Sequence, residues 1–193
     1  MIHLFSIRRF IYNQKQRIMK NTQLVATDGG SIKNGKPGCR ASFAVVFGKD
    51  DPRNISGEIT ESPSNQSGEM TAITTAIDII SDELADDILS KRTYNILTDS
   101  DYGMKCFTTW APNWLKNNWK NAKGKPVAHR QLIEPAYQKY LQNKEYIKFK
   151  HIRSHRSPPT DTESAAYKEW IFNDLADKAC GQVLKMRGGA SRQ

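Results

Sequence analysis

Two short apolar runs that both close in Thr-Asp constrain the fold of this chain more than any other feature. Residues 23–30 read QLVATDGG, and residues 94–102 read YNILTDSDY. Each pattern is typical of a buried strand that ends in a carboxylate, and two glycines after the first allow a sharp turn. Strands that end alike can place Asp28 and Asp99 side by side, which is unfavourable for two anions unless a cation lies between them. The pair predicts a divalent metal site, whereas an aspartate after a single strand is ordinary turn chemistry.

The length, charge and cysteine content of the chain limit the class of protein to which it can belong. With 193 residues it fits one domain with a real core, and its net charge of +9 is compatible with a polyanionic partner. Three widely spaced cysteines without a C-x-x-C pattern predict neither a disulfide framework nor a zinc site. We therefore expect a reducing intracellular compartment, the cytoplasm or the nucleus. No apolar run approaches the length of a membrane span, so no membrane association is expected.

The first 21 residues differ from the rest of the chain. They contain five lysines and arginines and no acidic residue, with apolar side chains between them. This composition is compatible with an organelle transit peptide, with a flexible basic arm on the substrate, or with an extension before a start at Met19. We expect residues 1–21 to be a basic leader, residues 22–187 to form one domain, and residues 188–193 to be a frayed tail.

Hydrophobic periodicity outlines the remaining elements of the domain. After the first strand, the pattern predicts strands over 41–47 and 54–60, a helix over 68–86, a helix over 129–143, a strand over 146–151 and a final helix. The first three strands form a predicted antiparallel meander. Glu69 would lie in the first turn of its helix, and Thr160 with Glu163 would cap the final helix. This order of elements predicts an α/β fold with a mixed sheet.

The segment from 102 to 133 has no Asp or Glu and is rich in lysine and tryptophan. Lysines contact phosphates and indoles stack on sugars or bases, so the segment predicts a nucleic-acid-binding surface over about 105–130. The alternative is a small tryptophan core with a solvated basic rim. The binding candidates are Trp110, Trp114, Lys116, Trp119, Lys120, Lys123 and Lys125.

Further carboxylates join the first pair. Asp28 and Asp99 end predicted strands, Glu69 begins a helix, and Asp177 lies in the final helix, four residues after Asn173 and thus on the same helical face. Each lies where its element meets the same edge of the sheet. A binding surface for a polyanion has no reason to collect four acids unless they hold cations.

Five stretches together match a known pattern: TDGG at 27–30, NQSGE at 65–69, LTDSDY at 97–102, NDLAD at 173–177, and the basic WAPNWLKNNWKNAKGKPV at 110–127. Over about residues 23–185 the chain resembles a cellular, type I ribonuclease H with its basic protrusion. The resemblance implies an RNase H-like fold with a five-stranded mixed sheet flanked by helices. It implies cleavage of the RNA strand of RNA–DNA hybrids with two Mg²⁺ ions, or Mn²⁺ in their place, leaving 5′-phosphate and 3′-hydroxyl ends.

The resemblance also implies roles for individual residues. Asp28 would be shared by both ions, with Glu69, Asp99 and Asp177 completing the metal shell. His155 matches the loop histidine that assists proton transfer or product departure, although Ser154 stands where most members have glycine. By position, the hybrid-contacting residues are Asn34, Asn65, Gln66 and His129, the last standing where many members have asparagine.

Three alternatives stay open. Integrases and exonucleases share such an acidic cluster but lack the Trp-Lys segment. A non-catalytic module of the same fold would bind or tether hybrids without cutting them. A domain of a reverse transcriptase polyprotein would carry the same motifs. We expect a monomer without an obligate protein partner.

Overall fold

The computed structural model describes residues 22–86, 92–154 and 156–186. The leader 1–21, His155 and the tail 188–193 lie outside the described residues, so the predictions made for them remain predictions. Within the described part, no helix is both long and apolar enough to span a membrane.

Five strands form one mixed sheet in the order β3-β2-β1-β4-β5. They are β1 (Thr22–Ile32), β2 (Arg40–Val46), β3 (Ile55–Ile59), β4 (Thr93–Thr98) and β5 (Ile147–His151). Consecutive strands β1, β2 and β3 are antiparallel, as the short turns between them require, whereas β4 pairs in parallel with both β1 and β5. The predicted five-stranded mixed sheet and its antiparallel meander are confirmed.

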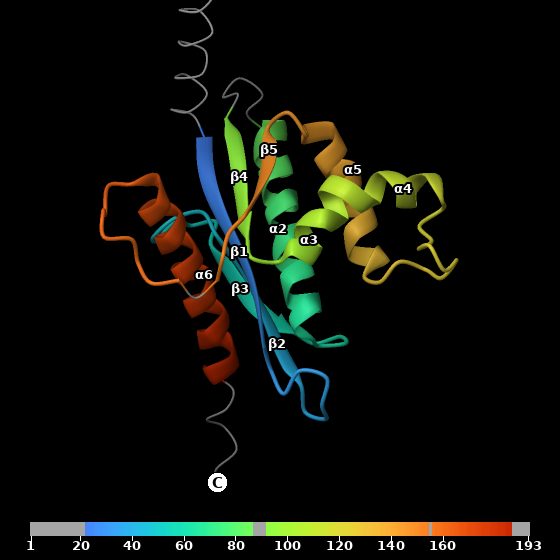
Figure 1. Cartoon of the computed structure of the whole chain (residues 1–193), viewed down its shortest axis with the longest axis horizontal. Helices are drawn as coiled ribbons and strands as arrows, with labels where there is room; N and C mark the ends of the chain where they lie inside the picture. Colours follow the sequence, from blue (N-terminus) through green and yellow to red (C-terminus); the bar gives the residue numbers. More distant parts are fainter. Residues whose placement is uncertain (1–21, 87–91, 155, 187–193) are drawn as a thin grey trace, which may run out of the picture.

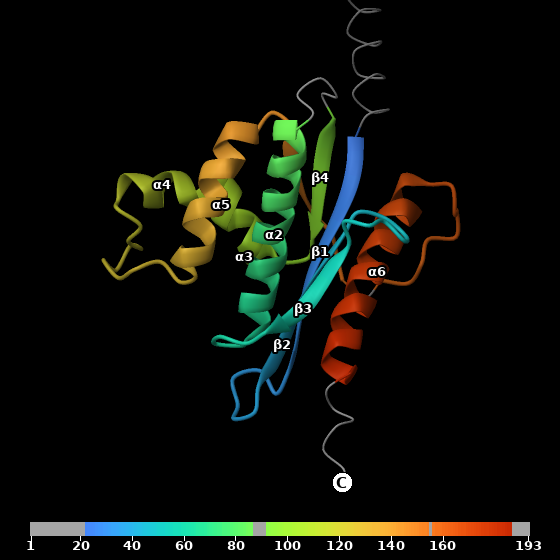
Figure 2. The same cartoon turned by 180° about the vertical axis from the view of Figure 1, so that it is seen from behind.

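Helices cover both faces of this sheet. They are α2 (Asn65–Asp86), α3 (Asp101–Lys105), a π-helical turn η1 (Cys106–Trp110), α4 (Ala111–Lys116), α5 (Arg130–Asn143) and α6 (Ala165–Met186). Figures 1 and 2 show α6 alone on one side of the sheet and α2, α3, α4 and α5 on the other. The loop between α4 and α5 extends furthest from the sheet, so the basic segment forms a projection beside it.

The core consists of two clusters, one on each side of the sheet. On the α2 side, the fully buried Met70, Ile73, Ile77 and Ile80 confirm the helical face that their spacing predicts. On the α6 side, small residues of β1 and β2 pack against Ala176 and Cys180, among others. Small side chains at this interface let α6 approach the sheet closely.

Serine hydroxyls cap the N-termini of both long helices, at positions that differ from the helix starts predicted from the sequence. The Ser64 and Ser67 hydroxyls each accept the other residue's backbone N–H, at 3.0 and 2.8 Å, so α2 begins at Asn65. Glu69 therefore lies in the second turn, and its predicted place in the first turn is wrong. At α6 the N–H of Tyr167 donates to the Ser164 hydroxyl at 3.1 Å, so the predicted Thr160–Glu163 capping box is wrong too.

Candidate active site

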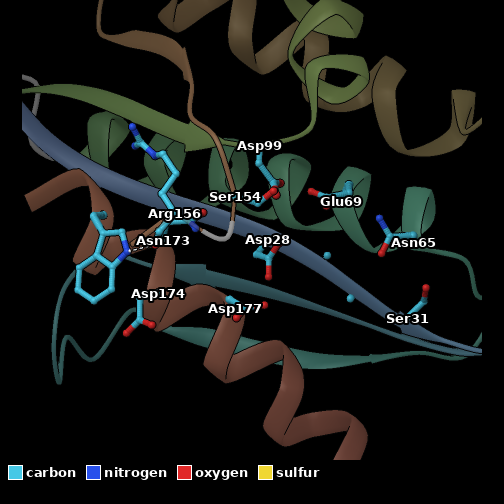
Figure 3. A pocket seen from close by; sticks show the side chains of 13 residues that line it. Asp28, Ser31, Asn65, Glu69, Asp99, Ser154, Arg156, Asn173, Asp174 and Asp177 are labelled. Carbon is cyan, nitrogen blue, oxygen red and sulfur yellow. Dashed lines mark hydrogen bonds between the residues drawn. The ribbon is translucent and has the colours of Figure 1, made fainter. Parts of the chain in front are cut away.

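Parallel pairing of β1 and β4 brings the first two carboxylates together. Ala26 lies opposite Leu97, and the Thr27 hydroxyl donates to the Leu97 carbonyl at 3.2 Å. Asp28 comes two residues after Ala26, and Asp99 comes two residues after Leu97. Figure 3 shows the side chains of both aspartates in one pocket. Asp28 is not at a strand end, however, because β1 continues to Ile32.

Two glycines bring Glu69 to this pair. A Cβ on Gly29 would lie 2.1 Å from the backbone nitrogen of Glu69, and one on Gly68 would lie 2.4 Å from the carbonyl oxygen of Ser42. Only glycine at both positions lets the backbone of α2 lie directly on β1 and β2. The expected turn at Gly29 is therefore wrong, since this glycine serves close packing within a strand, and the packing places Glu69 beside Asp28.

Buried hydrogen bonds hold α6 against the sheet at the height of Asp28. The Cys180 thiol donates to the Asp28 carbonyl at 3.3 Å, and the Ser42 hydroxyl donates to the Cys180 carbonyl at 3.1 Å. Asp177 lies one helical turn before Cys180 and therefore lines the pocket from the α6 side, together with Asn173. The structure thus brings all four predicted carboxylates to one pocket (Figure 3).

The donor atoms of this pocket suit a hard divalent cation. Carboxylate oxygens of Asp28, Glu69 and Asp99 lie within 4.8 Å of one another. Glu69 Oε2 and Asp99 Oδ1 are buried, and no donor among the described residues reaches them. Unpaired buried carboxylate oxygens are costly unless a cation neutralises them. An all-oxygen set of this kind is what Mg²⁺, Mn²⁺ and Ca²⁺ prefer.

Burial and mutual repulsion raise the pKa values of two of these acids. Glu69 is 6% exposed, and burial, followed by the charges of Asp99 and Asp28, raises its pKa to about 9. Asp28 is 7% exposed, and burial, then Asp99 and Asp177, raises its pKa to about 6. Without a cation the site therefore retains a proton on Glu69 at neutral pH.

Comparisons with known proteins agree with this geometry. A sequence model of the RNase H family matches residues 20–182. The chain belongs to the ribonuclease H family. A ribonuclease H of Schizosaccharomyces pombe is 34% identical over 144 residues, covering 74% of this chain and 50% of that protein. A probable ribonuclease H of Acanthamoeba polyphaga mimivirus is 32% identical over 149 residues, covering 76% of this chain and 62% of that protein.

The chain thus spans only half to about two thirds of the length of these curated relatives. Solved structures support the fold. A foamy viral protease–reverse transcriptase in complex with double-stranded DNA has a TM-score of 0.62 at 21% identity, covering 88% of this chain and 97% of that one. The solution structure of a PFV RNase H domain has a TM-score of 0.59 at 22% identity, covering 83% and 94%. At this identity the likeness concerns the fold alone.

A second pocket adjoins the carboxylates of this ribonuclease H family member. It shares Asn65, Glu69 and Asp99 with the first pocket and is also lined by Asn34 and Gln66. The Asn34 side-chain oxygen accepts a hydrogen bond from the backbone N–H of Asn65 at 3.0 Å, which joins the loop after β1 to the start of α2. The three predicted hybrid contacts therefore lie together, next to the acidic cluster.

Trp119 lies in the core of the basic segment and not on its surface. It is 2% exposed and packs against Trp114 and Tyr137, with ring centroids 6.2 Å away in both cases. The expectation that its indole stacks on nucleic acid is corrected, and the alternative of a tryptophan core applies to this residue. Trp110 and Trp114 are half-buried and pack on each other at 5.8 Å.

The lysines of the same segment point into solvent. All four predicted contacts are exposed, and none forms an ion pair within the described residues: Lys116, Lys120, Lys123 and Lys125. The Asn121 side chain orders their loop by accepting the backbone N–H groups of Lys123 and Lys125 at 2.9 and 3.1 Å. The lysine ammonium groups are therefore free of ion pairs within the described residues, and hydrogen bonds fix the loop backbone that carries them.

His129 takes a strained position outside both pockets. It precedes α5 with a left-handed φ of 56° and is half-buried, and this burial lowers the pKa of its imidazole. It is not among the residues that line the carboxylate pocket, and its predicted phosphate contact stays a prediction. Ser154 does line that pocket.

Arg156, Trp170 and Asp174, for which the sequence predicted no role in the site, also line the pocket. The indole N–H of Trp170 donates to the Arg156 carbonyl at 2.9 Å. The available signal was its spacing, because Trp170 precedes Asp177 by seven residues, or two helical turns, and so shares its face.

Proposed function

We propose that this chain is an endoribonuclease that hydrolyses the RNA strand of RNA–DNA hybrids and leaves 5′-phosphate and 3′-hydroxyl ends. The observation that carries the proposal is the group formed by the buried Asp28 and Glu69 and the half-buried Asp99, in a chain of the RNase H family. Their carboxylate oxygens lie within 4.8 Å of one another, and two of these oxygens are unpaired among the described residues. A cluster of this kind facing a polyanion is useful only with cations bound.

Asp28, Glu69, Asp99 and Asp177 would hold two Mg²⁺ ions, with Mn²⁺ as a substitute. When bound, such ions lower the pKa of a water molecule and stabilise the leaving 3′-oxygen. The chain's part is to fix the four carboxylates on four different segments of a rigid core: β1, α2, the end of β4 and α6. Because the pKa of Glu69 is raised to about 9, metal binding near neutral pH releases a proton from this site.

Recognition of the hybrid divides between two surfaces. Glu69 lines both pockets, and its carboxylate would meet the ribose 2′-hydroxyl that only the RNA strand carries. Neutral polar contacts to the hybrid would come from Asn34, Asn65 and Gln66. The exposed lysines of the α4–α5 loop supply attraction for phosphates. This attraction offsets the repulsion between a nucleic acid and the acidic cluster.

Cleavage of labelled substrates tests the proposal. Purified protein is incubated with an RNA–DNA hybrid, duplex RNA, duplex DNA and single-stranded RNA, in Mg²⁺ and in a chelator, with an Asp28→Asn variant as control. We expect cutting of RNA in the hybrid alone, only with Mg²⁺, and none by the variant. Hybrid binding without cleavage would overturn the proposal in favour of a tethering module.

We further propose a monomer in a reducing compartment. The Cys180 thiol donates to the Asp28 carbonyl behind the carboxylate pocket, so its oxidation would disturb the position of α6. Burial raises the pKa of this thiol and keeps it protonated, as a donor must be.

A further inference from the structure

One cation lines the carboxylate pocket on its α6 side. Arg156 shares this pocket with Asp28, Asp99 and Asp177. Its side chain is exposed and makes no ion pair or side-chain hydrogen bond with any residue in the described ranges. Four other arginines are each paired with a carboxylate: Arg40, Arg53, Arg92 and Arg130. The charge of Arg156 is therefore available to a ligand.

Trp170 ties the backbone of Arg156 to the helix that carries Asp177. The indole N–H of Trp170 donates to the Arg156 carbonyl at 2.9 Å, and its ring packs against Tyr167 with centroids 5.6 Å apart. Cys180 in turn fixes α6 at Asp28, so the backbone from which the Arg156 side chain extends has a defined position relative to the carboxylates.

The direction of the side chain decides which group it can reach. Figure 3 shows Arg156 extending away from Asp28 and Glu69, so its guanidinium does not point at the centre of the acidic cluster. A strand held with one phosphate at the cluster has its next phosphate further along the strand, away from the carboxylates. Guanidinium matches such a phosphodiester with two parallel hydrogen bonds.

Among the described residues that line the carboxylate pocket, Arg156 is the one lysine or arginine. The α4–α5 loop, which carries the exposed lysines, runs on the opposite side of the sheet from α6 (Figure 1). On the α6 side the pocket offers Asp174 and Asp177, and only Asp174 has a lysine partner, Lys178 at 2.6 Å. A strand crossing this side meets net negative charge unless Arg156 contacts it.

We propose that Arg156 binds a phosphodiester of the cleaved strand next to the one at the carboxylates, and that Trp170 is its positioning residue. This inference rests on the proposed ribonuclease function. It adds a second basic contact, distinct from the α4–α5 loop, that keeps the cleaved strand in the pocket.

Binding measurements in an Asp28→Asn background test it without cleavage. Fluorescence anisotropy gives the Kd for a labelled hybrid over a range of salt concentrations. We expect Arg156→Gln to raise Kd about five- to tenfold at low salt and to reduce the slope of log Kd against log salt by about 0.7 to 0.9, the loss of one phosphate contact. Arg156→Lys keeps the charge and should restore the slope with part of the affinity.

Lys144→Gln is the matched control. Lys144 is exposed after α5, near the start of β5 and hence at the opposite end of the sheet from Asp99. Its substitution removes the same charge and should leave Kd and slope unchanged. Trp170→Phe keeps an aromatic ring but removes the N–H donor, so it should weaken binding less than Arg156→Gln and add nothing to it in the double variant.

The outcomes separate the two proposals. If the wild-type protein cuts hybrids and Arg156→Gln binds with the parent slope, the arginine contact is wrong and the ribonuclease stands. A slope reduced equally by Lys144→Gln would also overturn the inference, because it would report net charge alone. If the wild-type protein neither binds nor cuts hybrids, both proposals fall.

Discussion

Asp28→Asn should stabilise the protein when no metal is present. Burial and the neighbouring acids raise the pKa of Asp28 from its ordinary value of 3.8 to about 6. At 1.36 kcal/mol per pKa unit, ionising this side chain costs the folded protein about 3 kcal/mol at neutral pH. Asparagine has nearly the same shape and carries no charge, so this cost disappears in the variant.

The sign of the effect depends on pH in a defined way. Between pH 3.8 and 6 the folded wild-type protein holds more protons on Asp28 than the unfolded chain does, so its free energy of unfolding falls as pH rises. The loss is nearly complete above about pH 7, and it vanishes below about pH 3, where the side chain is neutral in both states. The gain from Asp28→Asn should follow the same curve, from near zero at about pH 3 to about 3 kcal/mol at pH 7.5.

Thermal and urea unfolding in a chelator measure this gain. For a domain of this size, about 3 kcal/mol corresponds to a rise in Tm of about 6 to 12 °C. Saturating Mg²⁺ should reverse the order, since the wild-type protein gains binding energy and the variant loses a ligand. Cleavage should be lost in the variant, while hybrid binding remains.

Asp174→Asn is the matched control. Asp174 lines the same pocket but is paired with Lys178 at 2.6 Å, so its substitution should bring no gain. The reasoning fails if Asp28→Asn is no more stable than the wild-type protein at pH 7.5 in chelator, or if its gain is the same at pH 4.

Three further predictions concern packing and the basic loop. Gly29→Ala should destabilise the fold by about 3 kcal/mol or more and abolish cleavage, because the new Cβ would lie 2.1 Å from the backbone of α2. Gly181→Ala has open space around it and should change neither property. Urea unfolding and hybrid cleavage measure the two effects. Trp119→Ala should cost about 3 to 5 kcal/mol in urea unfolding because the side chain is buried, and weaker hybrid binding at unchanged stability would refute this assignment. Replacing Lys123 and Lys125 by glutamine should raise KM with kcat unchanged and reduce the salt slope by about 1.4 to 1.8, and a fall in kcat alone would contradict it.

Periodicity and turn chemistry were enough for most of the fold. The spacing of Met70, Ile73, Ile77 and Ile80 gave the buried face of α2 because these residues repeat with the period of a helix. Helix starts were harder. Ser64 and Ser67 cap α2 through their hydroxyls, and serine occurs too often in loops for such a pair to be distinctive before the backbone is known.

The tryptophans show the limit of reasoning from composition. A segment with lysines and tryptophans and no acids predicts a nucleic-acid surface, and the lysines are indeed exposed. Trp119 is buried because the chain adopts a left-handed turn there, with a φ of 57°, that directs the indole onto Tyr137. Composition alone does not distinguish an aromatic side chain that covers the core from one that faces solvent.

By itself the sequence determined the five strands, the three helices α2, α5 and α6, their order and the four acids, because these depend on local periodicity and on motifs of a few residues. Only the tertiary structure decided the distances among those acids. They depend on the parallel register of β1 and β4, on a glycine contact between β1 and α2, and on the bonds of Cys180 to residues more than 130 positions away. Such contacts join segments remote in sequence, and no local pattern encodes their geometry. The same applies to Arg156, which lines the pocket and whose carbonyl accepts the indole N–H of Trp170 from α6.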